Sequence, residues 1–198
     1  MSEIKTDFKN ITYSQTVSII SPEDVRQERI KYNKDKIQLK KALYKTYYHN
    51  NYFNGTNLTL KDRILLMSGF SPIYMDSKNR ECFRYTIHHI VPISCGGQTV
   101  LDNLIPLPRK FHDFIHSKII DPQIFGSKTG DKIEIKGLPD FSKITLEQMQ
   151  DENFIRDYQK FLVDCYDIIP VQFKKMKKSD RTELLNCWYK TMFGKERT

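Results

Sequence analysis

The sequence predicts an α+β protein that is mostly helical, with a histidine-rich strand, loop and helix at about residues 80–120. Apolar residues at helical spacing, with clear capping residues, dominate both ends of the chain. Strand-like alternation occurs only in short segments. Four of the five histidines fall between residues 88 and 116. The last observation marks this central segment as the place where chemistry is expected.

Length and composition predict one domain over residues 1–198. The chain is 39% hydrophobic and 28% charged, which is typical of a globular protein. We expect a mostly helical part at 1–79, a core motif at 80–120, and a connector with C-terminal helices at 121–198.

Segments that would target the chain to a membrane or to secretion are not evident. No run of eighteen apolar residues occurs, and the N-terminus lacks the apolar core of a secretory signal. We therefore expect no membrane partner, and either a cytoplasmic location or delivery into a target cell by a non-Sec route. The four cysteines form no C-x-x-C pair, which argues against a zinc ribbon.

The first half of the chain contains one short strand and two helices. Residues 11–20 alternate loosely and predict the strand. A long helix follows over about 21–48, with Ser21 as N-cap and Pro22 as first helical residue. Turn residues at 54–59 precede a short helix ending at Gly69. The expected buried stripe of the long helix consists of Ile30, Ile37, Leu43, Tyr44 and Tyr47.

The second half surrounds the histidines with further short elements. A turn at 71–80 precedes a strand that ends at Pro92, and the helix LPRKFHDFIHSKII follows the loop. Residues 125–141 predict a connector or small hairpin, and about 145–169 a helix that ends before Pro170. A last helix is expected from a Ser179 cap to Gly194, with Leu184, Leu185, Trp188 and Met192 in the core.

The charge pattern suggests a polyanionic partner. The net charge is +8 and the isoelectric point about 9.2, which favours nucleic acid, although an anionic membrane surface would attract the chain too. Lysines including Lys40 and Lys41 lie around the stripe of the long helix. They form either a solvated helix face or a surface that follows a phosphate backbone.

The spacing of the histidines predicts a metal site with a separate base. His112 and His116 are four residues apart, so a helix presents both on one face. His88 and His89 are adjacent in a strand and point to opposite faces. If His88 turns toward the helix, three imidazoles meet at one metal, and His89 stays available to take a proton. The plainer alternative is that His112 or His116 simply packs beneath the strands.

The pattern H-H-x13-N-x8-H-x3-H resembles the HNH, or ββα-metal, endonucleases, most closely the colicin- and pyocin-type DNase toxins and related polymorphic toxins. The resemblance covers about residues 80–120. It implies that His88, His112 and His116 bind metal, and that His89 is the general base. It further implies that Asn103 fixes the loop and that Arg84 contacts phosphate or the transition state. Arg109 and Lys110, at the start of the helix, would contact nucleic acid together with Lys40 and Lys41.

The sequence departs from these relatives at one position. They carry a glutamate two residues before the paired histidines, where this chain has Thr86. A hydrogen bond is therefore lost or rebuilt by another residue. The loop also lacks the cysteine pairs of HNH members with a structural zinc, so no second metal is expected.

The resemblance implies a metal-dependent endonuclease acting on DNA with little sequence specificity, as an antibacterial toxin or effector, or as a phage or defence nuclease. Magnesium or manganese would support activity, while zinc or nickel would also bind to three imidazoles. An acidic immunity or inhibitor protein is an expected partner of a toxin. RNA as substrate, and a binding module with a structural metal and no cleavage, are the alternatives.

Overall fold

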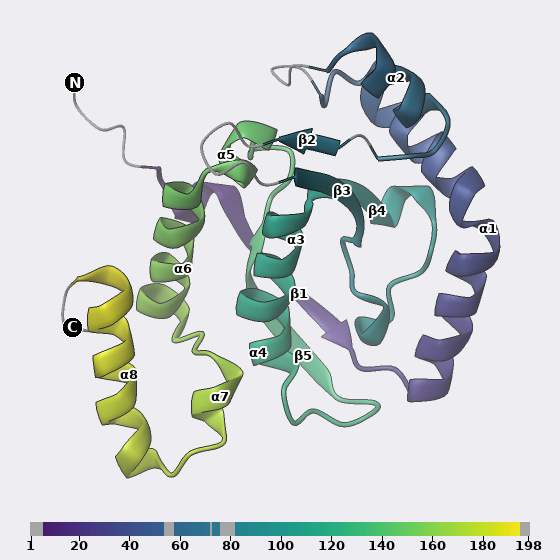
Figure 1. Ribbon diagram of the computed structural model, residues 1–198. Coiled ribbons are helices and arrows are strands. Elements are labelled where there is room, and N and C mark those ends of the chain that lie inside the picture. Colours follow the sequence, from purple (N-terminus) through teal and green to yellow (C-terminus); the bar gives the residue numbers. More distant parts are fainter. Residues whose placement is uncertain (1–5, 54–57, 72, 76–81, 195–198) are drawn as a thin grey trace, which may run out of the picture.

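The computed structural model describes residues 6–53, 58–71, 73–75 and 82–194 (Figure 1). Over these residues the fold is mixed α+β and 58% helical, as expected from the sequence. The helices are α1 (Pro22–His49), α2 (Leu60–Met67), α3 (Arg109–Phe114), α4 (Asp121–Ile124), α5 (Leu146–Gln150), α6 (Glu152–Tyr166), α7 (Val171–Lys174) and α8 (Lys178–Phe193). The strands are β1 (Thr12–Ser18), β2 (Ile73–Met75), β3 (Cys82–His89), β4 (Leu104–Pro108) and β5 (Lys132–Pro139).

The described strands form two small antiparallel sheets. One pairs β1 with β5, and the other has the order β2-β3-β4. In the second sheet His88 lies opposite Ile105, and His89 lies opposite Leu104. Helix α3 follows β4 directly and packs against β3 and β4 (Figure 1). Strands β3 and β4 with α3 therefore form the ββα unit that the sequence predicts at about residues 80–120.

Helix α1 begins where its capping residues predict. The Ser21 hydroxyl accepts a hydrogen bond from the Asp24 backbone N–H, and Pro22 is the first helical residue. Leu43 and Tyr44 are buried, but Ile30 and Ile37 are 51% and 57% exposed, so that part of the predicted stripe is wrong. Helix α1 packs against α2, β4 and the loop between β3 and β4. These contacts leave the side chains of both isoleucines exposed.

Two tyrosines tie the end of α1 to β4. The Tyr47 hydroxyl donates a hydrogen bond to the Leu104 carbonyl at 3.2 Å, and the Tyr52 hydroxyl donates one to the Pro106 carbonyl at 2.8 Å. Strand β4 is the end strand of its described sheet, so these carbonyls have no further strand to pair with. The tyrosines therefore fix α1 beside the ββα unit.

Several elements differ from the sequence-based expectation. The LIPLP segment forms β4 rather than loop and first helical turn, because an edge strand tolerates its two prolines and all five of its residues are buried. Residues of the expected connector form β5 and pair with β1. The helix expected over about 145–169 is interrupted at Asp151, whose extended backbone and side chain cap α6.

The C-terminal helix also differs in its start and in its packing. Helix α8 begins after Lys177, while the Ser179 hydroxyl bonds to the Asp180 carboxylate instead of capping the helix. Leu185 is buried, but Leu184 and Met192 are each 44% exposed, so their expected place in the core is wrong. The reason is that α8 contributes to a small separate cluster around Ile169 and Leu185.

The main hydrophobic cluster joins elements from both ends of the chain. It runs from Val17 in β1 to Ile168 after α6 and includes buried residues of α1, β3, β4 and α3. Because α7 and α8 lie outside this cluster, a single domain over residues 1–198 stays a prediction. None of the helices in the described ranges is both long enough and apolar enough to span a membrane.

Candidate metal centre

Three histidines from two elements meet at one point. His88 is the penultimate residue of β3, His112 lies in α3, and His116 lies in the π-helical turn Ile115–Ile120 that continues α3. Each offers a ring nitrogen, and these three nitrogens all lie within 4.8 Å of one another. The ring centroids of His112 and His116 are 4.7 Å apart, and both lie 5.1–5.4 Å from that of His88.

The π-helical turn arises from local sequence. The Asp121 backbone N–H donates to the His116 carbonyl five residues earlier, which is the spacing of a π-helix. Pro122 follows immediately; it has no N–H, and its ring would clash with the Lys118 carbonyl in a regular α-helix. The wider turn accommodates this proline. It leaves His112 and His116 side by side, as the i, i+4 spacing predicts.

The three imidazoles fit a divalent metal ion. His88 is 1% exposed, and its Nδ1 has no hydrogen-bond partner among the described residues. Burial and the nearby histidines hold the pKa of His88 well below its ordinary value. Burial, with a contribution from His112, lowers the pKa of His116 to about 4. Both rings are therefore neutral near pH 7 and present lone pairs, which is the state that a metal requires.

His89 stands apart from this group, as adjacent residues in a strand do. Its Nε2 lies 3.1 Å from the Thr99 hydroxyl oxygen. The rings of Tyr32 and His89 pack edge-on, with their centroids 5.6 Å apart. Burial lowers the pKa of His89, with Glu28 opposing and His112 adding to this effect. His89 is thus a neutral imidazole near the three-histidine cluster, in the state of a base that can accept a proton.

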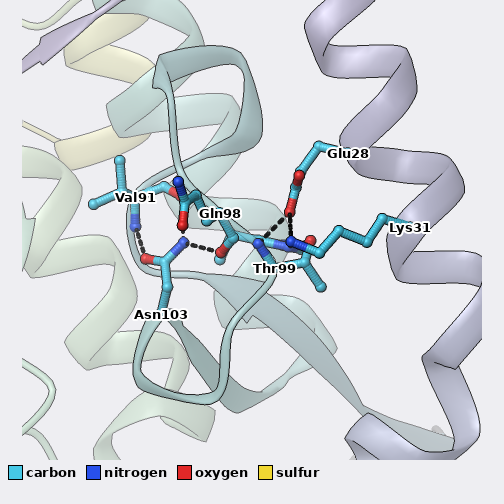
Figure 2. Close-up of polar contacts among 7 residues, drawn as sticks. Glu28, Lys31, Val91, Gln98, Thr99 and Asn103 are labelled. Atoms are coloured by element: carbon cyan, nitrogen blue, oxygen red, sulfur yellow. Dashed lines mark hydrogen bonds and ion pairs between the residues drawn. The ribbon is translucent and has the colours of Figure 1, made fainter.

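The side chain of Asn103 bridges the two ends of the loop between β3 and β4. Its side-chain oxygen accepts a hydrogen bond from the Val91 N–H at 2.8 Å. Its amide nitrogen donates to the carbonyls of Val91 and Gln98 at 3.1 and 2.8 Å (Figure 2). The Asn103 carbonyl accepts a further bond from the Ile90 N–H. Asn103 therefore fixes the backbone immediately after His89 without adding a charge.

Replacing Asn103 by aspartate is expected to destabilise the protein by about 1–3 kcal/mol. The shape is kept, but a carboxylate oxygen would replace the amide donor and face two carbonyl oxygens. Thermal unfolding measures the effect, with Asn33→Asp on the exposed surface of α1 as the matched control. Equal melting temperatures for the Asn103→Asp variant and the wild type would contradict the bracing role.

Gly97 allows the loop to close. An added Cβ would lie 1.8 Å from the Val91 carbonyl oxygen and 2.9 Å from the Asn103 amide nitrogen. Only glycine lets these backbone segments approach so closely. The two glycines of the turn thus have different roles. Gly97 allows the backbone to approach Val91 closely, and Gly96 has the left-handed conformation with φ +84°.

The Gly97→Ala variant is expected to lose at least about 1–3 kcal/mol, the usual cost of overpacking, because backbone must move. Gly126→Ala is the control: it has a positive φ of +83° but open space around its Cβ, so only about 1 kcal/mol of backbone strain is expected. Urea unfolding compares the two. A loss at Gly97 no greater than that at Gly126 would show that the loop can relax.

Of the basic residues predicted to contact nucleic acid, Arg84 lies away from the three-histidine cluster, and Arg109 and Lys110 pair with acidic side chains. Arg84 is exposed on β3, about 13 Å along the strand from His88. Arg109 lies 3.5 Å from Asp113, and Lys110 forms an ion pair with Glu152. Burial, with the nearby charge of Lys36, lowers the pKa of Lys40. Asp113 in turn lies 3.1 Å from His112 Nδ1. The role of these basic residues in binding nucleic acid stays a prediction.

Three residues near His89 were not predicted from the sequence. Thr99 contacts the His89 ring, Glu28 accepts a hydrogen bond from the Thr99 backbone N–H, and Tyr32 packs against His89. Glu28 and Tyr32 are four residues apart on one face of α1. No local sequence signal marks Glu28 and Tyr32, because both precede the paired histidines by more than fifty residues. Only the fold brings them close to His89.

The comparison with protein-family models agrees with the geometry. Residues 79–118 match the model of the family described as HNH endonuclease. A search of curated proteins and a search of solved structures found no match. The matched segment includes His88, His89, His112 and His116, together with Asn103. The match supports the assignment of residues 79–118 to the HNH endonuclease superfamily.

Proposed function

We propose that the protein is a metal-dependent endonuclease that hydrolyses phosphodiester bonds of DNA with little sequence specificity. The observation that carries this proposal is the pairing of two features: three histidines around one point, and a fourth beside them that faces elsewhere. A structural metal needs only the first feature. A base held off the metal is useful only when water must be deprotonated.

In this function His88, His112 and His116 would hold a divalent cation. The cation would supply positive charge to the scissile phosphate and to the leaving oxygen. His89 takes the proton from the attacking water through its ring nitrogen that does not face Thr99. The water oxygen then bonds to phosphorus as the P–O3′ bond breaks. Asn103 keeps His89 in place by fixing the backbone at Val91.

The metal that supports activity need not be the one that binds most tightly. Three neutral imidazoles favour zinc or nickel by affinity. We propose magnesium or manganese for catalysis, because hard cations coordinate phosphate oxygens well and leave room for water. The resemblance to HNH enzymes supports the same choice.

A plasmid-nicking assay tests the function. Supercoiled DNA is incubated with the protein and magnesium, manganese, nickel or zinc, and single-stranded RNA is offered in parallel. Nicking of DNA with at least one metal is the expected result. Binding of DNA without cleavage in every metal would favour the alternative of a binding module with a structural metal.

The net charge of +8 supports contacts with the phosphate backbone. If Lys40, Lys41, Arg109 and Lys110 contact phosphates, the affinity for DNA falls steeply with added salt. The double variant Lys40→Gln/Lys41→Gln is then expected to reduce the slope of log affinity against log salt by up to about 2. Fluorescence anisotropy measures the slope, and an unchanged slope would remove these lysines from the DNA-binding surface.

We propose an antibacterial toxin or effector as the biological setting, with a phage or defence nuclease as the second. The basic charge suits an acidic inhibitor protein, as a toxin would need in its own cell. Co-purification with the product of a neighbouring gene tests this setting. A small acidic protein that binds tightly and stops nicking is the expected result.

A further inference from the structure

One carboxylate of helix α1 is hydrogen-bonded to the loop of the ββα unit. The Thr99 backbone N–H donates a hydrogen bond to Glu28 Oε1, and Lys31 lies 3.6 Å from the same oxygen (Figure 2). Thr99 is 4% exposed and lies in the loop that Asn103 braces. A carboxylate from α1 thus fixes the position of a buried threonine.

Thr99 in turn contacts the proposed base. Its hydroxyl oxygen lies 3.1 Å from His89 Nε2. The Tyr32 ring, one helical turn after Glu28, packs edge-on against the His89 ring at 5.6 Å. His89 therefore meets α1 in two ways, through the Glu28–Thr99 pair and through Tyr32.

The charge of Glu28 bears on the direction of the hydrogen bond between Thr99 and His89. Burial would raise the pKa of the Glu28 carboxyl, but hydrogen bonds from the Thr99 backbone and side chain, and the charge of Lys31, lower it overall. An ionised carboxylate only accepts hydrogen bonds. If the Thr99 hydroxyl donates its proton to Glu28, its oxygen is left to accept one from His89. The His89 proton then sits on Nε2, and the lone pair is on Nδ1.

We propose that Glu28 and Thr99 are positioning residues that hold His89 in the Nε2–H tautomer, so that Nδ1 is the atom that accepts the proton from water. This inference rests on the proposed nuclease function for its consequence, since it assigns the base atom of that reaction. The tautomer itself can be measured without any activity. Fixing the tautomer of a histidine through its second nitrogen is a general way to orient such a base.

Nitrogen-15 NMR of the histidine rings tests the tautomer directly. At about pH 8 the neutral form is present, and long-range couplings distinguish protonated from unprotonated ring nitrogens. The wild type is expected to show His89 with a protonated Nε2 and an unprotonated Nδ1. In the Thr99→Val variant the two tautomers should mix, and Thr99→Ser should restore the wild-type pattern. A wild-type His89 protonated on Nδ1 would overturn the proposal.

Kinetics of plasmid nicking test the consequence. Thr99→Val and Glu28→Gln are expected to lower kcat by about 10- to 100-fold with KM unchanged, and Thr99→Ser to keep most of the activity. The matched controls are Thr16→Val, at an exposed position of β1, and Glu23→Gln, at an exposed position of α1. Both variants should nick DNA like the wild type. Melting temperatures establish that each variant is folded.

The two proposals fail in different ways. A wild type that does not nick overturns the nuclease function, while its NMR spectrum still decides the tautomer. A wild type that nicks, together with a folded Thr99→Val variant that nicks equally fast, overturns the positioning role alone.

Discussion

Replacing His89 by alanine is expected to lower the rate of plasmid nicking by about 10²- to 10⁴-fold, the usual contribution of a general base. Affinity for the metal should stay within a few-fold of wild type, because the His89 ring faces Thr99 rather than the cluster of His88, His112 and His116. Nicking kinetics and calorimetric titration with zinc measure the two properties on the same samples.

The fifth histidine provides the matched control. His49 is exposed at the end of α1, where its ring contacts only that of Tyr48 among the described aromatic pairs. The His49→Ala variant should nick and bind metal like the wild type. A His89→Ala variant that nicks as fast as His49→Ala would remove His89 from the reaction.

Loss of a proposed metal ligand is expected to abolish both metal binding and nicking. The His116→Ala variant should weaken zinc binding by more than about 100-fold, because even the loss of a residue that only supports a ligand costs 10- to 100-fold. His116 is partly exposed, so its removal leaves a smaller cavity than removal of the fully buried His88. Competition with a chromogenic chelator measures the affinity.

Comparison with the metal-free protein distinguishes a loss of metal binding from a loss of folding. His116→Ala and the wild type treated with chelator should have similar melting temperatures, and zinc should raise only that of the wild type. His88→Ala, examined in parallel, should show the same loss of zinc binding with a larger loss of stability. Undiminished zinc affinity in both variants would show that the metal lies elsewhere.

The site could be predicted from the sequence where its parts are close along the chain. The i, i+4 spacing of His112 and His116 survives the π-helical turn, since the two rings remain 4.7 Å apart. The alternation of a strand separates His88 from His89 as expected. Asn103 closes the loop through hydrogen bonds within twelve residues of it. Such local geometry follows from periodicity and turn chemistry alone.

Features that depend on tertiary packing could not be predicted. Glu28 lies 71 residues before Thr99, and only the placement of α1 brings them together. The exposure of Ile30 and Ile37 has the same origin, because a helical pattern does not show how much of a helix is covered. Strand β4 was missed since prolines usually argue against a strand.

The attachment of α1 bears on whether the ββα unit can be transplanted. Residues 79–118 contain every proposed ligand and the base, and look like a self-contained cassette. Yet Glu28, Tyr32, Tyr47 and Tyr52 all approach that cassette from one helix and its end. Grafted onto another scaffold, the segment would carry its histidines but leave β4 carbonyls and the Thr99 amide without these partners. Transfer of the proposed activity to another scaffold would therefore require helix α1 together with the ββα unit.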